Sequence, residues 1–209
     1  MSAGTDRLQL ADADALSDLG RYAVRAKAVD DAGAMRLQAF GGVLAAWVGV
    51  LPGRGILGEG TVLGLRTFAL AAPATLDVVV PLGAVTDRTA RPGAGAEFPV
   101  PPTLALAPWA ALTPPRSGWE HVLDLPCAPL AEVATAGIGE VAAALAERGA
   151  AAGFTRERVW GAPLEGGLRA GGAFAAYALG FLTPDGTARL WRTGRWLRLS
   201  APGGHVLLR

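Results

Sequence analysis

Titratable and metal-binding side chains are scarce in this chain. Its 209 residues contain two histidines, one cysteine and one lysine, and these lie far apart: His121, His205, Cys127 and Lys27. Chemistry near neutral pH commonly needs a histidine, a nucleophile beside a base, or grouped metal ligands. We therefore expect no catalytic residue, no metal site and no cofactor, and we favour a protein that is not an enzyme.

The lack of a second cysteine and of a long apolar segment sets further limits. One cysteine excludes an intrachain disulfide, which fits a reducing compartment. Residues 1–10 include Asp6 and Arg7 and lack the apolar core of a secretory signal. Six prolines interrupt the uncharged residues 98–115, and residues 170–184 are too few to cross a bilayer. We expect a cytoplasmic protein with no membrane partner.

The charges balance, so no global attraction to a polyanion is expected. There are 19 lysines and arginines against 18 acids, and the formal net charge is +1. Apolar residues make up 51% of the chain and charged residues 18%, a composition typical of a globular protein. Binding to nucleic acid is therefore not expected.

Residue patterns predict an α+β fold, because helices and antiparallel strands occur in blocks. Residues 1–90 predict a helix, a four-stranded meander and a short helix. Residues 12–29 form the first helix, capped by Asp12 or Asp14, and residues 82–89 form the second. The four strands are residues 35–40, 43–51, 61–71 and 76–80, with Gly41-Gly42 as the turn between the first two.

The second half follows a proline-rich segment, residues 91–118, which we interpret as an extended connector. Residues 119–209 predict two helices and a three-stranded C-terminal unit. The elements are a strand at 121–125, helices at 129–149 and 168–182, and strands at 187–192, 195–200 and 206–208. Antiparallel meander and hairpin strands thus pack with three to four helices in a mixed two-layer architecture. The two halves form either separate domains or one shared domain.

Arginine and tryptophan are concentrated on the C-terminal strands. A two-residue turn at residues 193–194 would place Trp191 opposite Trp196 and Arg189 opposite Arg198. Side chains alternate along strands, so these four residues share one face. Three interpretations compete: packing beneath a helix, a protein–protein or homodimer face, and polyanion binding. Tryptophan and arginine are the residues most enriched at binding hot spots.

A glycine motif follows an apolar strand. Gly53, Arg54, Gly55 and Gly58 stand in a G-x-G-x-x-G pattern, which in dinucleotide sites brings the backbone close to a pyrophosphate. The residues after it suit a strand better than the helix that such a site needs. A nucleotide-binding loop and a glycine-rich hairpin loop both stay open.

Several polar side chains lie near the single cysteine in sequence. They are Ser117, Glu120, His121 and Asp124. On a regular strand His121 and Asp124 point to opposite faces, so we expect no catalytic pair. His205 follows Pro202-Gly-Gly204 and is interpreted as a turn or strand-edge residue.

Five short stretches resemble a family of conserved actinobacterial proteins of unknown function. They are MRLQ at residues 35–38, PPRSGW at 114–119, VWG at 159–161, AAYALGFL at 175–182 and GHVLLR at 204–209. The resemblance covers most of the chain. None of the stretches is a recognised functional motif, so it implies no activity, ligand or catalytic residue.

Together these patterns predict a non-catalytic cytoplasmic binding or assembly protein. It would form a homo-oligomer, such as a dimer, or bind another protein. The alternative is an enzyme or sensor that binds a nucleotide or another anionic small molecule. It would use the loop at residues 53–60 or the face that carries Arg189 and Arg198.

Overall fold

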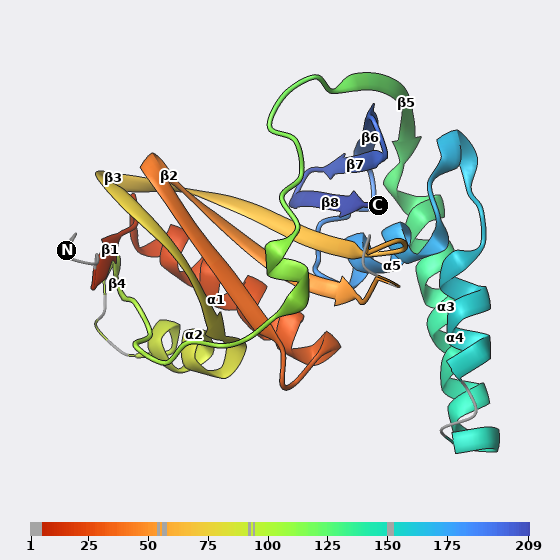
Figure 1. Cartoon of the computed structure of the whole chain (residues 1–209), viewed down its shortest axis with the longest axis horizontal. Coiled ribbons are helices and arrows are strands. Elements are labelled where there is room, and N and C mark those ends of the chain that lie inside the picture. Colours follow the sequence, from red (N-terminus) through yellow and green to blue (C-terminus); the bar gives the residue numbers. More distant parts are fainter. Residues whose placement is uncertain (1–5, 54, 56–57, 92, 94, 150–152) are drawn as a thin grey trace. The chain divides into compact units, whose positions relative to one another are not determined.

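The computed structural model describes residues 6–53, 55, 58–91, 93, 95–149 and 153–209. In this part of the chain five α-helices and eight strands form an α+β fold, as predicted, and the strands make two antiparallel sheets (Figure 1). The chain divides into two compact units, each made of two segments. The first unit is Met1–Val50 with Leu65–Thr113, and the second is Leu51–Gly64 with Pro114–Arg209.

The first unit combines two long strands with two helices and a small second sheet. Its elements are β1 (Arg7–Gln9), α1 (Ala13–Val29), β2 (Ala34–Leu51), most of β3 (Val62–Pro81), α2 (Leu82–Thr89), β4 (Glu97–Pro99) and the 3-10 turn η1 (Pro108–Ala111). Both predicted helices are confirmed. Helix α1 begins at the predicted cap, where the Asp12 carboxylate accepts the Ala15 N–H at 2.7 Å.

The prediction of a four-stranded meander is wrong, because the residues assigned to its four strands form two long strands, β2 and β3. Strand β2 runs for 18 residues through Gly41-Gly42, and β3 runs for 20 residues through Pro73. Gly41 has a positive φ of 57°, yet Gly41 and Gly42 both belong to β2, and the chain continues through them as a strand. The loop between the two strands lies at the glycine motif instead.

The proline-rich segment contributes to the first unit. Its residues Glu97–Pro99 form β4, which pairs antiparallel with β1 and sets Phe98 opposite Leu8. Both of these side chains are buried. Further along, the Ala105 N–H donates to the Val79 carbonyl at 2.8 Å. The segment is therefore anchored by a strand pair and by a buried aromatic ring, and it is not only an extended connector.

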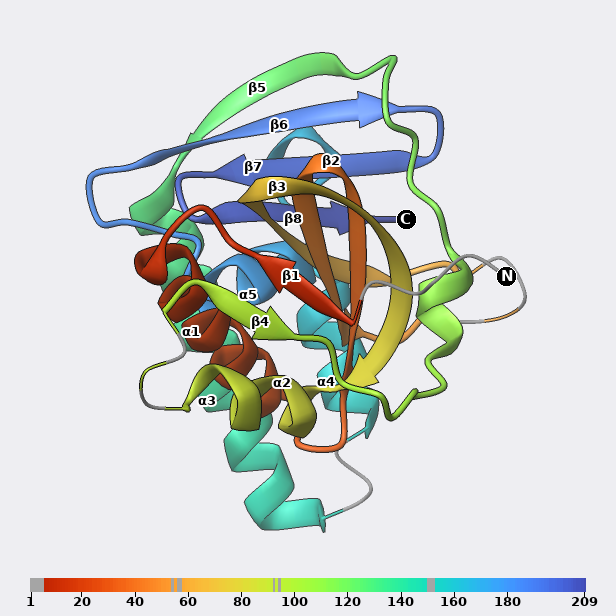
Figure 2. The same ribbon diagram turned by 90° about the vertical axis from the view of Figure 1, so that its left-hand side faces the viewer.

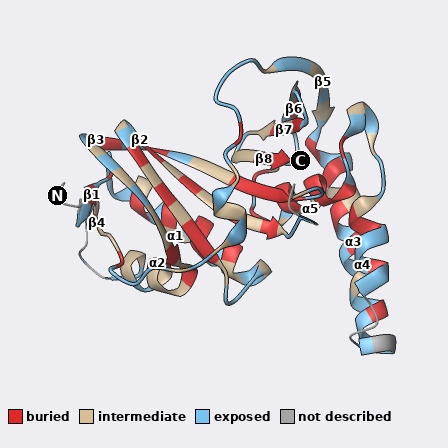
Figure 3. Ribbon diagram, in the orientation of Figure 1, coloured by how far each residue is buried: buried red, intermediate tan, exposed pale blue. Residues whose placement is uncertain are grey.

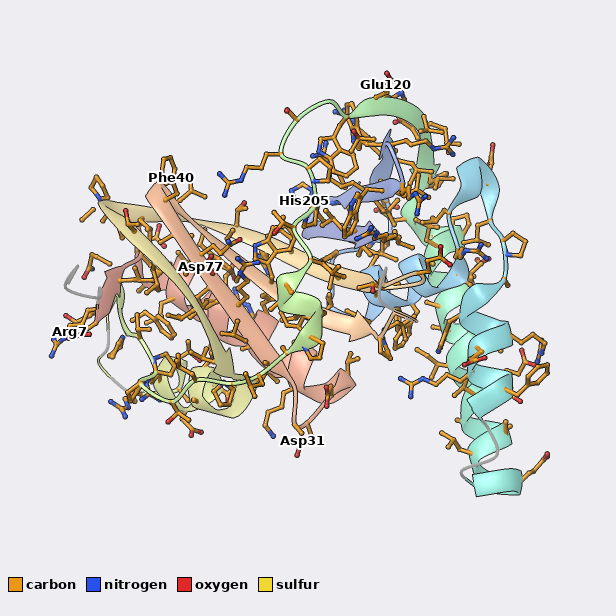
Figure 4. The ribbon with its side chains drawn as sticks, in the orientation of Figure 1. Arg7, Asp31, Phe40, Asp77, Glu120 and His205 are labelled. Atoms are coloured by element: carbon orange, nitrogen blue, oxygen red, sulfur yellow. The ribbon has the colours of Figure 1, made fainter. Side chains whose placement is uncertain are left out.

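A polar cluster joins β2, β3 and η1 in the first unit, and its carboxylate is that of Asp77, which Figure 4 labels. The Arg36 guanidinium donates through two nitrogens to the Asp77 carboxylate, at 2.8 and 2.7 Å, and through the third to the Ala110 carbonyl at 2.7 Å. The hydrogen bond to Asp77 is the main reason that the pKa of Arg36 is raised. Every nitrogen of this guanidinium is used within the fold, so we assign the cluster a structural role.

The second unit contains four neighbouring strands of the six-stranded antiparallel sheet, and helices lie on one side of these four strands. Its elements are β5 (Glu120–Pro126), α3 (Cys127–Arg148), α4 (Gly153–Gly161), the 3-10 turn η3 (Glu165–Gly167), α5 (Ala170–Ala178), β6 (Thr187–Thr193), β7 (Trp196–Ala201) and β8 (Gly204–Leu208). The strands lie in the order β5-β6-β7-β8, which Figure 2 shows from the side, and β8 is also bonded to β3. The predicted strands and both predicted helices are confirmed, whereas α4 was not predicted.

The helices cover one face of this sheet. Buried residues on that face come from three strands: Ala188, Leu190, Leu199 and Val206. A Cβ atom added to Gly172 of α5 would lie 2.7 Å from the Leu168 side chain and 3.0 Å from that of Leu208 on β8. One added to Gly166 of η3 would lie 2.6 Å from the Leu123 side chain and 2.7 Å from that of Leu190. These close approaches place η3 and α5 against the apolar face, so the opposite face is the one that carries the predicted tryptophans and arginines.

Helix α3 is apolar but poorly covered. By length and composition alone, residues Cys127–Glu147 could cross a membrane, the one such helix in the described part of the chain. Only 22% of that window is buried. Exposed Ile138 and Leu145 lie in its second half (Figure 3). The helix therefore presents apolar side chains to its surroundings.

Candidate functional site

The hairpin β6–β7 differs in register from the prediction. Trp191 lies opposite Arg198, and Trp196 lies opposite Thr193. The predicted pairing of the two tryptophans is wrong, because the turn is formed by residues 194–195, with Gly194 at φ 51° in its first central position. This moves the pairing by two residues. Because side chains alternate with a period of two, the shift leaves every side chain on its predicted face.

The Arg–Trp face is the sheet face opposite the helices, and it is defined by Trp119, Arg189, Trp191, Trp196 and Arg198. At its centre the Arg198 guanidinium carbon lies 4.6 Å from the ring centroid of Trp119 and 5.4 Å from that of Trp191. Each contact of this kind stabilises by about 0.5–2 kcal/mol, more when water is excluded. Trp119, which precedes β5, was not among the predicted site residues. Its indole N–H donates to the Pro115 carbonyl at 3.0 Å, which fixes the ring.

Arg198 is partly removed from water by its two indole neighbours. Burial lowers the pKa of its guanidinium, which still carries its charge at neutral pH. Its Nε atom is buried and makes no hydrogen bond to any residue that the structure describes. A buried donor without an acceptor is energetically costly, so this atom does not contribute to the stability of the fold.

The remaining members of the face divide into a buried and an exposed residue. Trp196 is only 7% exposed, and the Arg209 guanidinium carbon lies 5.7 Å from a ring centroid of its indole. Arg189 is exposed and lies opposite Asp124 on β5 and opposite Ser200 on β7. Trp196 therefore supports the sheet, and Arg189 is accessible to a ligand.

A bulge in β5 brings His121 and Asp124 together. The pairing with β6 skips Val122, so His121 lies opposite Trp191 and Asp124 opposite Arg189. The His121 Nε2 atom is 2.7 Å from an Asp124 carboxylate oxygen. The expectation that these side chains point to opposite faces is wrong, because the extra residue changes the alternation between them. The imidazole also meets the Trp191 ring edge-on, with centroids 5.2 Å apart.

His205 lies on the same sheet face (Figure 4). It stands opposite Ser200 in the β7–β8 pair, with its Nδ1 atom 3.0 Å from the Ser200 hydroxyl oxygen. Burial, and then the charge of Arg198, lower the pKa of His205. Both histidines of the chain therefore border the Arg–Trp face, a convergence that sequence spacing did not predict. Among the described residues, no group of three or more His, Cys, Asp or Glu side chains could hold a metal ion.

Acidification is expected to destabilise the chain through His205. Its pKa in the fold lies below the ordinary 6.5, so the unfolded chain takes up the proton at higher pH than the folded chain does. The stability that neutral His205 contributes is complete above about pH 6.5 and is lost as pH falls through the lowered folded value. Urea unfolding at about pH 7.5 and about pH 5 measures the loss, which should be smaller in His205→Gln. An identical loss in both proteins would contradict this role.

The described residues of the glycine motif lie between β2 and β3, next to the C-terminal residue: the Gly60 N–H donates to the Arg209 carbonyl at 2.7 Å. Arg54 lies outside the described residues. The Gly58 N–H donates to the Gly55 carbonyl, and the Thr61 N–H donates to the Gly58 carbonyl, both at 3.2 Å. A Cβ atom on Gly53 would lie 2.0 Å from the Thr61 hydroxyl oxygen. The loop leads into a strand and not into a helix, and its own packing accounts for Gly53. These features favour the hairpin-loop interpretation over nucleotide binding.

Fold and site together define an α+β protein with an arginine- and tryptophan-rich sheet face. Residues 3–111, more than half of the chain, match a family model described as "Domain of unknown function (DUF8010)". The chain belongs to this family, which confirms the predicted resemblance to an uncharacterised family. Residues 114–209 match a second model, "Domain of unknown function (DUF8185)". A comparison with curated proteins gives no match.

Proposed function

We propose that this chain is a non-catalytic binding and assembly protein that associates with a second copy of itself through the Arg–Trp face. The observation that carries the proposal is the Arg198 guanidinium held against Trp119 and Trp191 on the sheet face opposite the helices. Aromatic rings and arginine that are already ordered lose little conformational entropy when they bind, which favours them as interface anchors.

The exposure of these side chains supports an interface. Trp119, Trp191 and Arg198 are each partly exposed, so they are neither fully solvated nor fully enclosed within the chain. The edge strand β5 is a poorer candidate for association. It contains the bulge at Val122, the charged side chains of Glu120 and Asp124, and Pro126 at its end. Bulges, charges and proline are the features that keep sheet edges from pairing with another chain.

Replacing Arg198 with alanine is expected to weaken self-association by about 2 kcal/mol, or about 30-fold in Kd. The substitution removes the guanidinium from between the two indoles and leaves the tryptophans in place. Sedimentation equilibrium over a range of concentrations measures the effect. Arg195→Ala is the matched control, because Arg195 is an exposed arginine in the turn of the same hairpin. Equal weakening by both substitutions would mean that general charge, and not the stacked arginine, governs association.

A second candidate function is the binding of an anionic small molecule at the same face. The observation that favours it is the presence of two arginines on this face, of which Arg189 is exposed and Arg198 is partly exposed. A melting screen over nucleotides and sugar phosphates tests it. A ligand present at a hundred times its Kd adds about 2.7 kcal/mol of stability, which raises the melting temperature measurably. A screen without any shift would count against this candidate.

A further inference from the structure

Ser200 lies at the centre of a group of polar side chains on the Arg–Trp face. Arg189 stands directly opposite it on β6, and His205 directly opposite it on β8. Arg198 lies two residues before it on the same strand and points to the same side. Opposed residues have Cβ atoms about 4.5–5.5 Å apart, and residues two apart along a strand are about 7 Å apart. Four polar side chains from three adjacent strands therefore surround one point.

The hydrogen-bonding groups at this point are mainly donors. Arg189 and Arg198 each present a guanidinium, which has donors and no acceptor. The Ser200 hydroxyl and His205 Nδ1 are 3.0 Å apart. When Nδ1–H donates to the serine oxygen, the hydroxyl proton of Ser200 is free to donate outward. An acceptor placed above Ser200 would meet two guanidinium groups and a hydroxyl.

The charge of the face favours an anion. The strands β5–β8 place one carboxylate on it, that of Asp124, which already bonds His121. The other acid of β5, Glu120, pairs opposite Arg192, a residue that points to the helix-covered side. The two positive guanidinium groups on this face are therefore balanced by only one carboxylate, which is already bonded to His121. The group around Ser200 carries net positive charge even after Asp124 is counted.

We propose that Arg189, Arg198, Ser200 and His205 form a binding site for a phosphate group. A planar carboxylate is satisfied by one guanidinium. A tetrahedral phosphate, with three or more oxygens, can accept from two guanidinium groups and a hydroxyl that approach from different strands. The inference rests on the second candidate function, small-anion binding at the Arg–Trp face, and names its ligand class and two further residues of the site.

Isothermal titration calorimetry on the full chain tests the site, with inorganic phosphate, phenyl phosphate and benzoate as probes. Both phosphates are expected to bind, and benzoate is expected to bind at least about tenfold more weakly because it lacks the third oxygen. Tighter binding of phenyl phosphate would indicate a phosphate ester as the ligand, and equal binding would indicate free phosphate. Benzoate that binds as well as phenyl phosphate would overturn the assignment.

Variants of the site separate it from general attraction by charge. Arg189→Gln is expected to weaken phosphate binding by about tenfold or more, and Ser200→Ala by a smaller factor. Arg195→Gln removes the same charge from the turn and should leave binding unchanged. Arg189 and Arg195 are both exposed, so both variants should fold, which circular dichroism verifies. Equal losses in Arg189→Gln and Arg195→Gln would overturn the proposal.

The same titrations distinguish failure of this site from failure of the function on which it rests. If phenyl phosphate or benzoate binds and Arg198→Ala abolishes its binding, while Arg189→Gln and Ser200→Ala do not, the phosphate site is wrong and anion binding at the face stands. If none of these anions binds, both are wrong. Self-association is measured separately, by sedimentation without any added anion.

Discussion

Replacing Phe98 with alanine is expected to destabilise the first unit by about 3–5 kcal/mol, the largest effect foreseen here. The side chain is completely buried in a segment whose composition is that of a connector. Strand β4 holds it opposite Leu8 of β1, and β4 contacts both α1 and α2. Removing the ring leaves a cavity among elements that the chain brings together from distant positions. Urea unfolding of the full chain, followed by circular dichroism, measures the loss.

The control for Phe98 is an apolar residue of the same segment that the fold leaves in solvent. Leu106 is fully exposed, so Leu106→Ala should change the free energy of unfolding by less than about 0.5 kcal/mol. If Phe98→Ala costs no more than Leu106→Ala, the segment is a surface connector after all and the β1–β4 pair contributes little.

The two tryptophans of the β6–β7 hairpin are expected to respond differently to replacement by serine. Trp196→Ser should cost about 3 kcal/mol or more, because the indole is 7% exposed and the substitution leaves a cavity with a polar group in it. Trp191→Ser should cost about 1 kcal/mol, since it loses mainly the stacking on Arg198 and the contact with His121. Unfolding curves of both variants at one protein concentration make the comparison.

A similar cost for the two substitutions would contradict the division of the face into supporting and accessible parts. If Trp191→Ser costs as much as Trp196→Ser, the Trp191 ring is part of the core of the second unit and cannot be an interface anchor. Association would then have to be sought elsewhere on the chain.

Elements with local signals could be predicted from the sequence. Asp12 caps α1 through its own side chain, and α2 follows Pro81 with the predicted bounds. The C-terminal strands are short, alternate clearly and are joined by glycine turns. In each case the residues that decide the structure lie within a few positions of one another.

Elements that depend on distant pairing could not be predicted. Gly41 and Pro73 are local signs of a break, yet β2 and β3 continue past them. Helix α4 has little apolar periodicity, with exposed Phe154 near its start and buried Trp160 near its end. Its position depends on α3, where a Cβ atom on Gly137 would lie 2.5 Å from the Trp160 ring. The local sequence contains no signal for any of these pairings.

The candidate site, too, could be predicted from the sequence only in part. The common face of Arg189, Trp191, Trp196 and Arg198 was predictable, because alternation does not change when the register moves by two residues. The neighbours of that face were not predictable. His121 and Asp124 meet through a bulge, and Ser200 meets His205 across strands whose register no local pattern reveals. The register between strands determines which polar side chains become neighbours. A site made of such neighbours can therefore be recognised only in the folded structure.

Native mass spectrometry of the full chain and of Trp191→Ser is the most direct test of the central claim, self-association through the Arg–Trp face. We expect a dimer for the unaltered chain and a folded monomer for the variant at the same concentration. Arg195→Ala should remain a dimer. An unaltered chain that is monomeric at every concentration, or a Trp191→Ser variant that dimerises as well as the unaltered chain, would contradict self-association through this face.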